Sequence, residues 1–275
     1  RRKIKLIVKR MKIRVFCIQT NSSQFPSKNI EMLDKIFKKI KATKINLICL
    51  PECVAIFSDE KKRINDFLSN WNNQFLDLIK YYSKKKNSYI LIGSVPKKNK
   101  NNKFFNRSLI IDPKGEVVSS YDKINLFDVF LSKEEKYIES KNYDSGKKIN
   151  LTKLPWGNLG MTICYDLRFP LLYKKLAKKG AHFFSIPAAF TYTTGISHWE
   201  SLLRARAIEN GCFVFAPAQC GYHDNGRRTF GNSMIVDPWG KILKRAKNSI
   251  GSISCDIDLE KVNFYRKRIP AMTEF

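Results

Sequence analysis

Residues 232–243 read NSMIVDPWGKIL, and residues 107–118 read RSLIIDPKGEVV. Each segment combines a serine-containing apolar strand, a D-P-x-G turn and a returning strand. Asp, Pro and Gly stand at the positions that a type I turn favours. Such turns are common, so the likeness can be coincidental. If it is not, the chain has two related α/β halves, with two sheets packed face to face and helices outside.

Apolar runs typical of strands alternate with helical patterns around these two segments. The run IRVFCIQ (13–19) predicts a strand, and the spacing of Ile30, Leu33 and Phe37 predicts a helix after it. Strands that are apolar on both faces are typical of sheets covered on both sides. Further strands are expected at 46–51, 89–96, 107–112, 159–165, 182–188, 212–218, 232–237 and 251–258, and further helices at 68–82, near 170–179 and around 198–210.

The length of 275 residues suits one large α/β domain, which we place at 11–275. Met11 opens a clean strand, so residues 1–10 are expected to be an N-terminal extension or a remnant of the expression sequence. No run reaches the roughly 18 apolar residues of a membrane span, and the basic N-terminus lacks the apolar core of a signal peptide. Seven cysteines without a CxxC pair favour reduced thiols, a cytoplasmic location and no structural metal.

The composition is strongly basic, with 51 Lys and Arg against 24 Asp and Glu and a net charge of +27. A field of this strength attracts polyanions without specificity. The lysines, however, are spread through every segment, and no stretch matches a known nucleic-acid-binding module. We therefore expect no specific nucleic-acid or membrane partner, although the charge can help to attract small anionic substrates.

Three chemically capable side chains stand at or near the ends of apolar runs. They are Glu52 in LPEC, Lys123 in YDKINLFDV and Cys164 in GMTICYDLRFP. A free cysteine is often only a small buried hydrophobe, and a lone Glu or Lys in such a place is usually structural. In a catalytic interpretation, Cys164 is a nucleophile held at a turn. Partial burial would then raise the pKa of Glu52 and suit it to general-base work.

A cysteine nucleophile more commonly takes a histidine as its base. The sequence has only three histidines: His182 begins an apolar strand, His198 begins a plausible helix, and His223 lies in a polar loop. None has an evident context for activating a thiol. A carboxylate can do the same work if a neighbouring cation offsets its charge.

The three motifs, in this order, resemble those of the nitrilase (carbon–nitrogen hydrolase) superfamily. Four further stretches add a likeness to its Nit branch: HWESLLRARAIEN, APAQCG, FGNSMIVDPWG and CDIDLEKV. The resemblance covers the chain from about Met11 to Pro270. The resemblance implies an α/β fold, a four-layer αββα sandwich in a single domain. It also implies a homodimer or higher homo-oligomer and an enzyme without metal or organic cofactor.

The resemblance also implies a role for each catalytic residue. Cys164 would attack the amide carbon, and Glu52 would take the thiol proton and later activate water. Lys123 would stabilise the oxyanion together with the backbone N–H of Tyr165. Glu139, in YIES, would position Lys123 and the leaving amine.

Four further residues are candidates for substrate binding. The backbone of Tyr165 is one. Arg168 could bind a substrate carboxylate, or instead pair with Asp166 or a helix end. Phe190 and Thr194 follow a strand end, where α/β folds place ligands.

The substrate class follows from the branch. The resemblance implies a thiol amidase that cleaves the C–N bond of a small carboxylate-bearing amide through a thioester and releases ammonia. APAQCGYHDNGRRTFGNSMIVDPWG favours the deaminated glutathione amidases. An omega-amidase or an N-carbamoyl amino acid hydrolase is the alternative, whereas YDLRFP differs from the CWE pattern of nitrilases. A non-catalytic protein that binds through its basic surface is the alternative from a different class.

One position departs from the branch. The catalytic lysine is usually followed by x-His, but here KIN places Asn125 at the histidine position. The loop after it, FDVFLSKEEKYIES, is more acidic and richer in lysine than is usual. Because this loop is expected to frame the pocket, the departure bears on substrate preference.

Overall fold

Two six-stranded mixed sheets pack face to face at the centre of the structure, a computed structural model that describes residues 12–41, 44–133 and 135–271. The first sheet has the order β16 (Gly251–Asp258), β1 (Lys12–Gln19), β2 (Leu47–Cys49), β3 (Tyr89–Lys98), β4 (Phe104–Ile111) and β5 (Val117–Asp122). The second has the order β15 (Ile242–Arg245), β14 (Met234–Val236), β11 (Phe213–Ala216), β10 (Phe183–Ser185), β9 (Gly157–Met161) and β8 (Asn150–Leu154).

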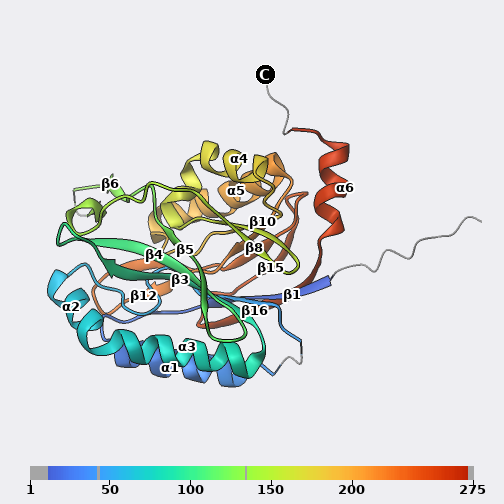
Figure 1. Cartoon of the computed structure of the whole chain (residues 1–275). Helices are drawn as coiled ribbons and strands as arrows, with labels where there is room; N and C mark the ends of the chain where they lie inside the picture. Colours follow the sequence, from blue (N-terminus) through green and yellow to red (C-terminus); the bar gives the residue numbers. More distant parts are fainter. Residues whose placement is uncertain (1–11, 42–43, 134, 272–275) are drawn as a thin grey trace, which may run out of the picture.

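Helices cover the outer face of each sheet (Figure 1). The first sheet carries α1 (Pro26–Lys39) and α3 (Asn72–Lys86), and the second carries α4 (Pro170–Lys178) and α5 (Tyr192–Asn210). The four-layer αββα sandwich and the single α/β domain are therefore confirmed. Other elements are α2 (Lys61–Asp66), α6 (Glu260–Arg268), and the hairpins β6 (Asp128–Phe130) with β7 (Lys136–Ile138) and β12 (Cys220–Tyr222) with β13 (Arg228–Phe230).

The layering follows from the alternation of side chains along each strand. In β1, Val15 and Cys17 belong to the core between the two sheets, whereas Phe16 and Ile18 belong to the core beneath α1 and α3. Successive side chains of a strand point to opposite faces. A strand that is apolar at every position can therefore fill two cores at once, which is why these runs do not show a polar alternation.

The repeated D-P-x-G segments form the same structure in the two sheets. In both turns the glycine N–H donates a 2.9 Å hydrogen bond to the aspartate carbonyl, from Gly115 to Asp112 and from Gly240 to Asp237. The hairpin β4–β5 ends one sheet and β14–β15 ends the other, each antiparallel beside a set of parallel strands. The likeness of the two segments is thus structural and not a coincidence of turn composition.

Several predicted boundaries were wrong. Helix α5 begins at Tyr192, so His198 lies inside the helix and not at its start. The Thr- and Gly-containing first turn is a poor helix signal, but packing overrides it, since a Cβ on Gly195 would lie 2.3 Å from Phe230. The helix expected over 68–82 is α3, preceded by the π-helical turn Phe67–Trp71. Strands β6 and β7 lie in FDVFLSKEEKYIES, which was expected to be a loop, and β8 lies where no strand was expected.

The proposed extension at residues 1–10 lies outside the described residues and stays a prediction. None of the helices in the described ranges is long and apolar enough to cross a membrane.

Candidate active site

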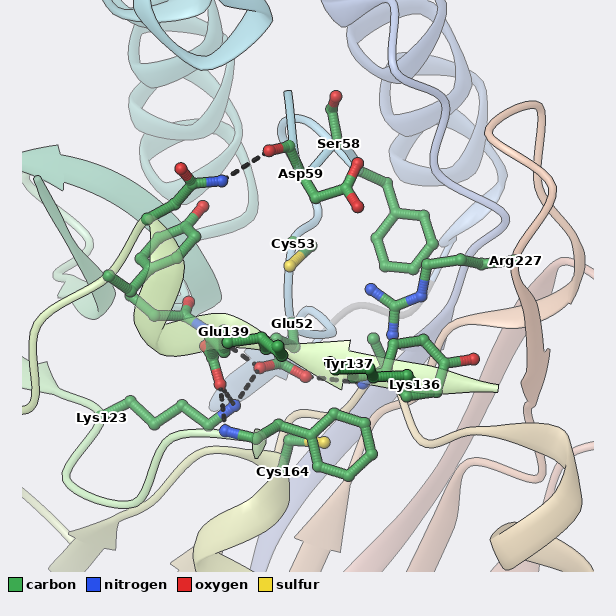
Figure 2. A pocket seen from close by; sticks show the side chains of 17 residues that line it. Glu52, Cys53, Ser58, Asp59, Lys123, Lys136, Tyr137, Glu139, Cys164 and Arg227 are labelled. Atoms are coloured by element: carbon green, nitrogen blue, oxygen red, sulfur yellow. Dashed lines mark hydrogen bonds and ion pairs between the residues drawn. The ribbon is translucent and has the colours of Figure 1, made fainter. Parts of the chain in front are cut away.

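Glu52, Lys123 and Cys164 meet in one pocket of about 140 Å³ (Figure 2). Glu52 follows β2 and Lys123 follows β5, both in the first sheet, whereas Cys164 follows β9 in the second. The three side chains come from sequence positions far apart, and the face-to-face packing of the sheets brings them together. All three are nearly inaccessible, at 4%, 2% and 6% exposed.

Glu52 is held by donors on both carboxylate oxygens. Its Oε1 accepts a 2.9 Å hydrogen bond from Lys123 Nζ, and its Oε2 accepts one of 2.8 Å from the backbone N–H of Ala189. The strand end is fixed by a close approach of β3, because a Cβ on Gly93 would lie 2.2 Å from the carbonyl oxygens of Leu50 and Pro51. Only glycine allows the two backbones this contact.

Burial raises the pKa of Glu52, but the charge and hydrogen bond of Lys123 outweigh it, so the pKa lies below its ordinary value. The expectation of a raised pKa was therefore wrong. It considered desolvation alone and could not foresee a buried ammonium group 2.9 Å away. Glu52 is consequently a carboxylate and is able to accept a proton.

A second carboxylate completes the environment of Lys123. Glu139 lies in the 3₁₀ turn Glu139–Lys141. Its Oε2 accepts a 2.8 Å hydrogen bond from Lys123 Nζ and one of 2.7 Å from the backbone N–H of Phe127. Burial lowers the pKa of Lys123, but the charges of Glu139 and Glu52 raise it by more than burial lowers it. The resulting pKa is well above its ordinary value. Lys123 is thus a cation.

Asn106 joins the two glutamates, a role that the sequence analysis did not predict. Its Nδ2 donates to Glu52 Oε1 at 2.9 Å and to Glu139 Oε1 at 3.0 Å. A single asparagine within a strand carries no sequence signal for such a role. Its backbone carbonyl also accepts from the N–H of Lys123 at 3.0 Å.

Cys164 stands on a strained turn between β9 and the 3₁₀ turn Cys164–Arg168. Its φ of +44° lies in the left-handed region, which non-glycine residues adopt at a cost. The backbone N–H of Cys164 donates to Pro187 O at 2.9 Å and fixes this conformation. Burial, and then the charge of Glu52, raise the pKa of the thiol well above its ordinary value, with only partial relief from Lys123. The resting cysteine is a thiol beside a carboxylate.

The buried carboxylate of Asp166 holds the residues next to this turn. Its Oδ2 accepts from the hydroxyl of Tyr121 at 2.7 Å and from the backbone N–H of Ile163 at 2.9 Å. Its Oδ1 accepts from the backbone and side-chain nitrogens of Asn125 at 3.0 and 2.8 Å. Asp166 thus bonds to the cysteine turn and to the loop that follows Lys123.

The four predicted substrate-binding residues are not among those that line the pocket. The ring of Tyr165 packs against Phe127. The guanidinium group of Arg168 lies 5.2 Å from the ring centroid of Phe190, and its Nη2 contacts His198 Nδ1 at 3.2 Å, so it does not pair with Asp166. The hydroxyl of Thr194 lies 2.6 Å from that of Thr191.

The pocket has an outer part that the sequence did not reveal. Its lining includes the charged side chains of Asp59, Lys136 and Arg227 and the rings of Phe57 and Tyr137. Lys136 and Tyr137 lie on the short strand β7 and the other three residues lie in connecting segments, and none of these stretches carries a sequence signal for binding. The three histidines all belong to the described part of the chain and none of them lines the pocket, so a Cys–His pair is not formed here.

Comparisons with known proteins identify the family of the chain. The model of the family described as carbon-nitrogen hydrolase matches residues 14–267. The chain belongs to this family. It is therefore a hydrolase that acts on carbon–nitrogen bonds other than peptide bonds.

Relatives of this carbon-nitrogen hydrolase share nearly its whole length. A deaminated glutathione amidase of Dictyostelium discoideum is 38% identical, covering 98% of this chain and 95% of the relative. One of Yersinia enterocolitica is 34% identical, covering 94% and 91%. The resemblance to the Nit branch is thus confirmed.

Solved structures show the same fold. The NitFhit protein of C. elegans superposes with a TM-score of 0.90 at 32% identity, covering 96% of this chain and 65% of that longer one. Saccharomyces cerevisiae Nit3, a member of branch 10 of the nitrilase superfamily, superposes with a TM-score of 0.83 at 26% identity, covering 96% of both chains.

Proposed function

We propose that this hydrolase is a thiol amidase that acts on small carboxylate-bearing amides, with deaminated glutathione as its first candidate substrate. The observation that carries the proposal is the meeting of three groups in one pocket: a cysteine on a strained turn, a carboxylate, and a lysine kept charged by two carboxylates. An amide carbonyl resists attack, and this set supplies a nucleophile, a base and an oxyanion partner.

In the first half of the reaction, Cys164 Sγ attacks the amide carbon while Glu52 takes the thiol proton. Because the thiol pKa is raised, the proton leaves as the new C–S bond forms, without a free thiolate at rest. The ammonium group of Lys123 and the backbone N–H of Tyr165 stabilise the oxyanion. The C–N bond then breaks, Glu52 gives its proton to the leaving nitrogen, and a thioester remains.

The second half returns the enzyme to its starting state. Glu52 removes a proton from water, and the hydroxide attacks the thioester carbon. The C–S bond breaks, the sulfur takes the proton back from Glu52, and the carboxylic acid leaves. Glu139 and Asn106 keep Lys123 and Glu52 in place throughout, since each bonds to the catalytic groups.

The identity of the leaving group depends on the substrate. In deaminated glutathione the amide nitrogen belongs to cysteinylglycine, so its hydrolysis releases cysteinylglycine. The ammonia expected from the resemblance would come from a primary amide such as α-ketoglutaramate, the substrate type of an omega-amidase. The names of the two relatives support the first substrate. An N-carbamoyl amino acid is the third alternative.

The test is product formation by the wild type, Cys164→Ala and the control Cys255→Ala, which changes a thiol of β16 outside the pocket. The substrates are deaminated glutathione, α-ketoglutaramate, succinamate and an N-carbamoyl amino acid, and the assays measure carboxylic acid, ammonia and cysteinylglycine. We expect turnover of at least one substrate by the wild type and the control, and none by Cys164→Ala. Turnover that survives in Cys164→Ala would refute the thiol mechanism.

The net charge of +27 favours a second candidate, a binding protein that uses its basic surface. Binding to a polyanion by charge alone falls steeply with salt, whereas turnover in a buried pocket is less screened. Folded wild-type protein that turns over none of the four substrates but binds RNA in a salt-dependent manner would favour this candidate.

We also propose that the chain is a cytoplasmic homodimer. The seven free cysteines suit a reducing compartment. Exposed apolar side chains on α4, α5 and the neighbouring β14–β15 turn suit an interface between copies: Leu171, Ile196, Ile208 and Trp239. Sedimentation of the wild type and of Leu171→Asp tests the dimer, because a charge in the interface should give a monomer.

A further inference from the structure

Arg227 reaches the outer part of the pocket from the turn between β12 and β13. Its guanidinium carbon lies 4.8 Å from the ring centroids of both Phe57 and Tyr137. Figure 2 shows the guanidinium group pointing into the pocket from the side opposite to Lys123. The two rings hold a long, flexible side chain in one orientation, which favours the binding of a planar group.

The charge of Arg227 has no counter-ion in the described part of the chain. No described carboxylate lies within ion-pair distance of it, and its Nε is buried without a hydrogen-bond partner. A buried polar group without a partner is costly, and a charged one more so. By contrast, the buried Arg206 pairs with Glu209 at 2.7 Å and bonds to a backbone carbonyl.

The cation at the inner end of the pocket cannot serve a substrate carboxylate. The Nζ of Lys123 already bonds to Glu52 and to Glu139, at 2.9 and 2.8 Å. A carboxylate placed beside this group would face two negative charges. The guanidinium carbon of Arg227 lies 4.8 Å from the ring centroid of Tyr137, and that ring lies 5.2 Å from the ring of Phe127, the residue whose N–H bonds to Glu139. Two aromatic rings in contact thus connect the reacting end of the pocket to the outer cation.

The other charged groups of the outer pocket are less suited to this role. Lys136 lines the pocket, but its ammonium lies over the ring of Phe130, and its side chain is exposed. Asp59 lines the pocket and carries the wrong charge, with its side chain open to solvent. Arg168, one candidate for a carboxylate partner in the sequence analysis, does not line the pocket.

We propose that Arg227 binds the carboxylate of the substrate, at the end of the pocket opposite the amide that reacts. A guanidinium group can donate two parallel hydrogen bonds to a carboxylate, and this contact would give Arg227 the counter-ion that it lacks. The proposal rests on the proposed amidase function and narrows it. The substrates are amides that carry a carboxylate a few bonds from the reacting carbon, and neutral amides of similar size are poor substrates.

The first measurement separates binding from turnover. In the Cys164→Ala background, isothermal titration follows the binding of succinamate and of butyramide, which has a similar length but no carboxylate. Arg227→Met should weaken the binding of succinamate about tenfold or more and leave that of butyramide unchanged. Arg227→Lys, which keeps the charge but not the paired geometry, should lie between the two. Equal effects on both ligands, or no effect on succinamate, would overturn the proposal.

A matched control lies one residue away. Arg228 stacks on the rings of Tyr192 and Tyr222 and does not line the pocket. Arg228→Met should leave succinamate binding within about twofold of the unsubstituted background, so a similar loss in both variants would indicate general charge attraction and refute the site. Circular dichroism confirms the fold of each variant. If Arg227→Met does not fold, the Arg227→Lys comparison decides alone.

The binding results and the turnover results can fail separately. Charge-selective binding that depends on Arg227, in a protein that hydrolyses no amide, would support the carboxylate site and refute the amidase. Hydrolysis of succinamate with an unchanged kcat/KM in Arg227→Met would support the amidase and refute the site.

Discussion

Asn125 donates two hydrogen bonds to one oxygen of Asp166, from its backbone at 3.0 Å and from its side chain at 2.8 Å. Asn125 lies two residues after Lys123, and Asp166 lies two residues after Cys164. The pair therefore links the loop of the cation to the turn of the proposed nucleophile. The asparagine found where the resemblance led us to expect histidine still supplies a donor to this carboxylate.

Replacing Asn125 should slow the chemical step more than it weakens substrate binding. Asn125→Ala removes one donor from a buried carboxylate, a loss of about 1–3 kcal/mol, and Asn125 itself does not line the pocket. We expect kcat to fall about tenfold to a hundredfold with little change in KM, and Asn125→His to recover part of the rate. Steady-state kinetics measures both. A rise in KM at constant kcat would show that Asn125 acts on binding instead.

Asn106→Asp should be more damaging than Asn106→Ala. Both changes remove the amide that donates to Glu52 and Glu139, but the aspartate adds a third carboxylate beside them. Mutual repulsion would raise the pKa of Glu52 and reduce its ionised fraction. The pH profile of kcat/KM should therefore shift to higher pH in Asn106→Asp, and raising the pH should recover part of its activity. An unshifted profile would contradict this role.

Lys123→Met should destabilise the fold as well as abolish activity. The change leaves the buried Glu52 and the partly buried Glu139 without their shared cation, and breaking a buried ion pair costs about 3–5 kcal/mol. The double variant Lys123→Met/Glu139→Gln should recover part of this loss, because only one carboxylate remains charged. Urea unfolding measures the free energies. Equal stabilities of the single and double variants would show that the repulsion is absent.

His223 should make the protein sensitive to mild acid. Its Nδ1 lies 2.8 Å from Ser22 O and its Nε2 lies 2.7 Å from the hydroxyl of Thr229, an arrangement that the neutral imidazole satisfies. Burial lowers its pKa from 6.5 to about 4. The unfolded chain therefore binds the proton first, and the stability present above pH 6.5 is lost as the pH falls toward 4.

The loss attributable to His223 is about 3 kcal/mol at most. Thermal unfolding between pH 7 and pH 4 should show a smaller decline in His223→Asn than in the wild type, although the variant is less stable at pH 7. Parallel declines would assign the acid sensitivity to other groups.

The fold could be predicted from the sequence because local patterns and global layering agree. Strands such as β1 are apolar at every position, which indicates sheets covered on both faces, and the repeated turns mark the same corner of each sheet. The start of α5 could not be predicted, since the contact of Gly195 with Phe230 outweighs local propensity there. The hairpin β6–β7 was missed because its strands have only three residues each and no buried face.

The chemical identities in the site could be predicted, but their electrostatics could not. Motif order pointed to Glu52, Lys123 and Cys164, which the structure brings into one pocket. The direction of the pKa of Glu52 depends on a cation 71 residues away in the sequence, so only the folded chain reveals it. The roles of Asn106 and Arg227 could not be predicted for a similar reason, because they depend on neighbours in space and not in sequence.

The proposed base and cation follow strands of one sheet, and the proposed nucleophile follows a strand of the other. The catalytic rate therefore depends on how the two sheets are aligned. A substitution in the core between them can leave both sheets folded and shift one against the other by a fraction of an ångström. Melting temperature would barely register such a shift, whereas the rate would. The turnover rate is therefore a more sensitive measure of the relative position of the two sheets than any unfolding curve.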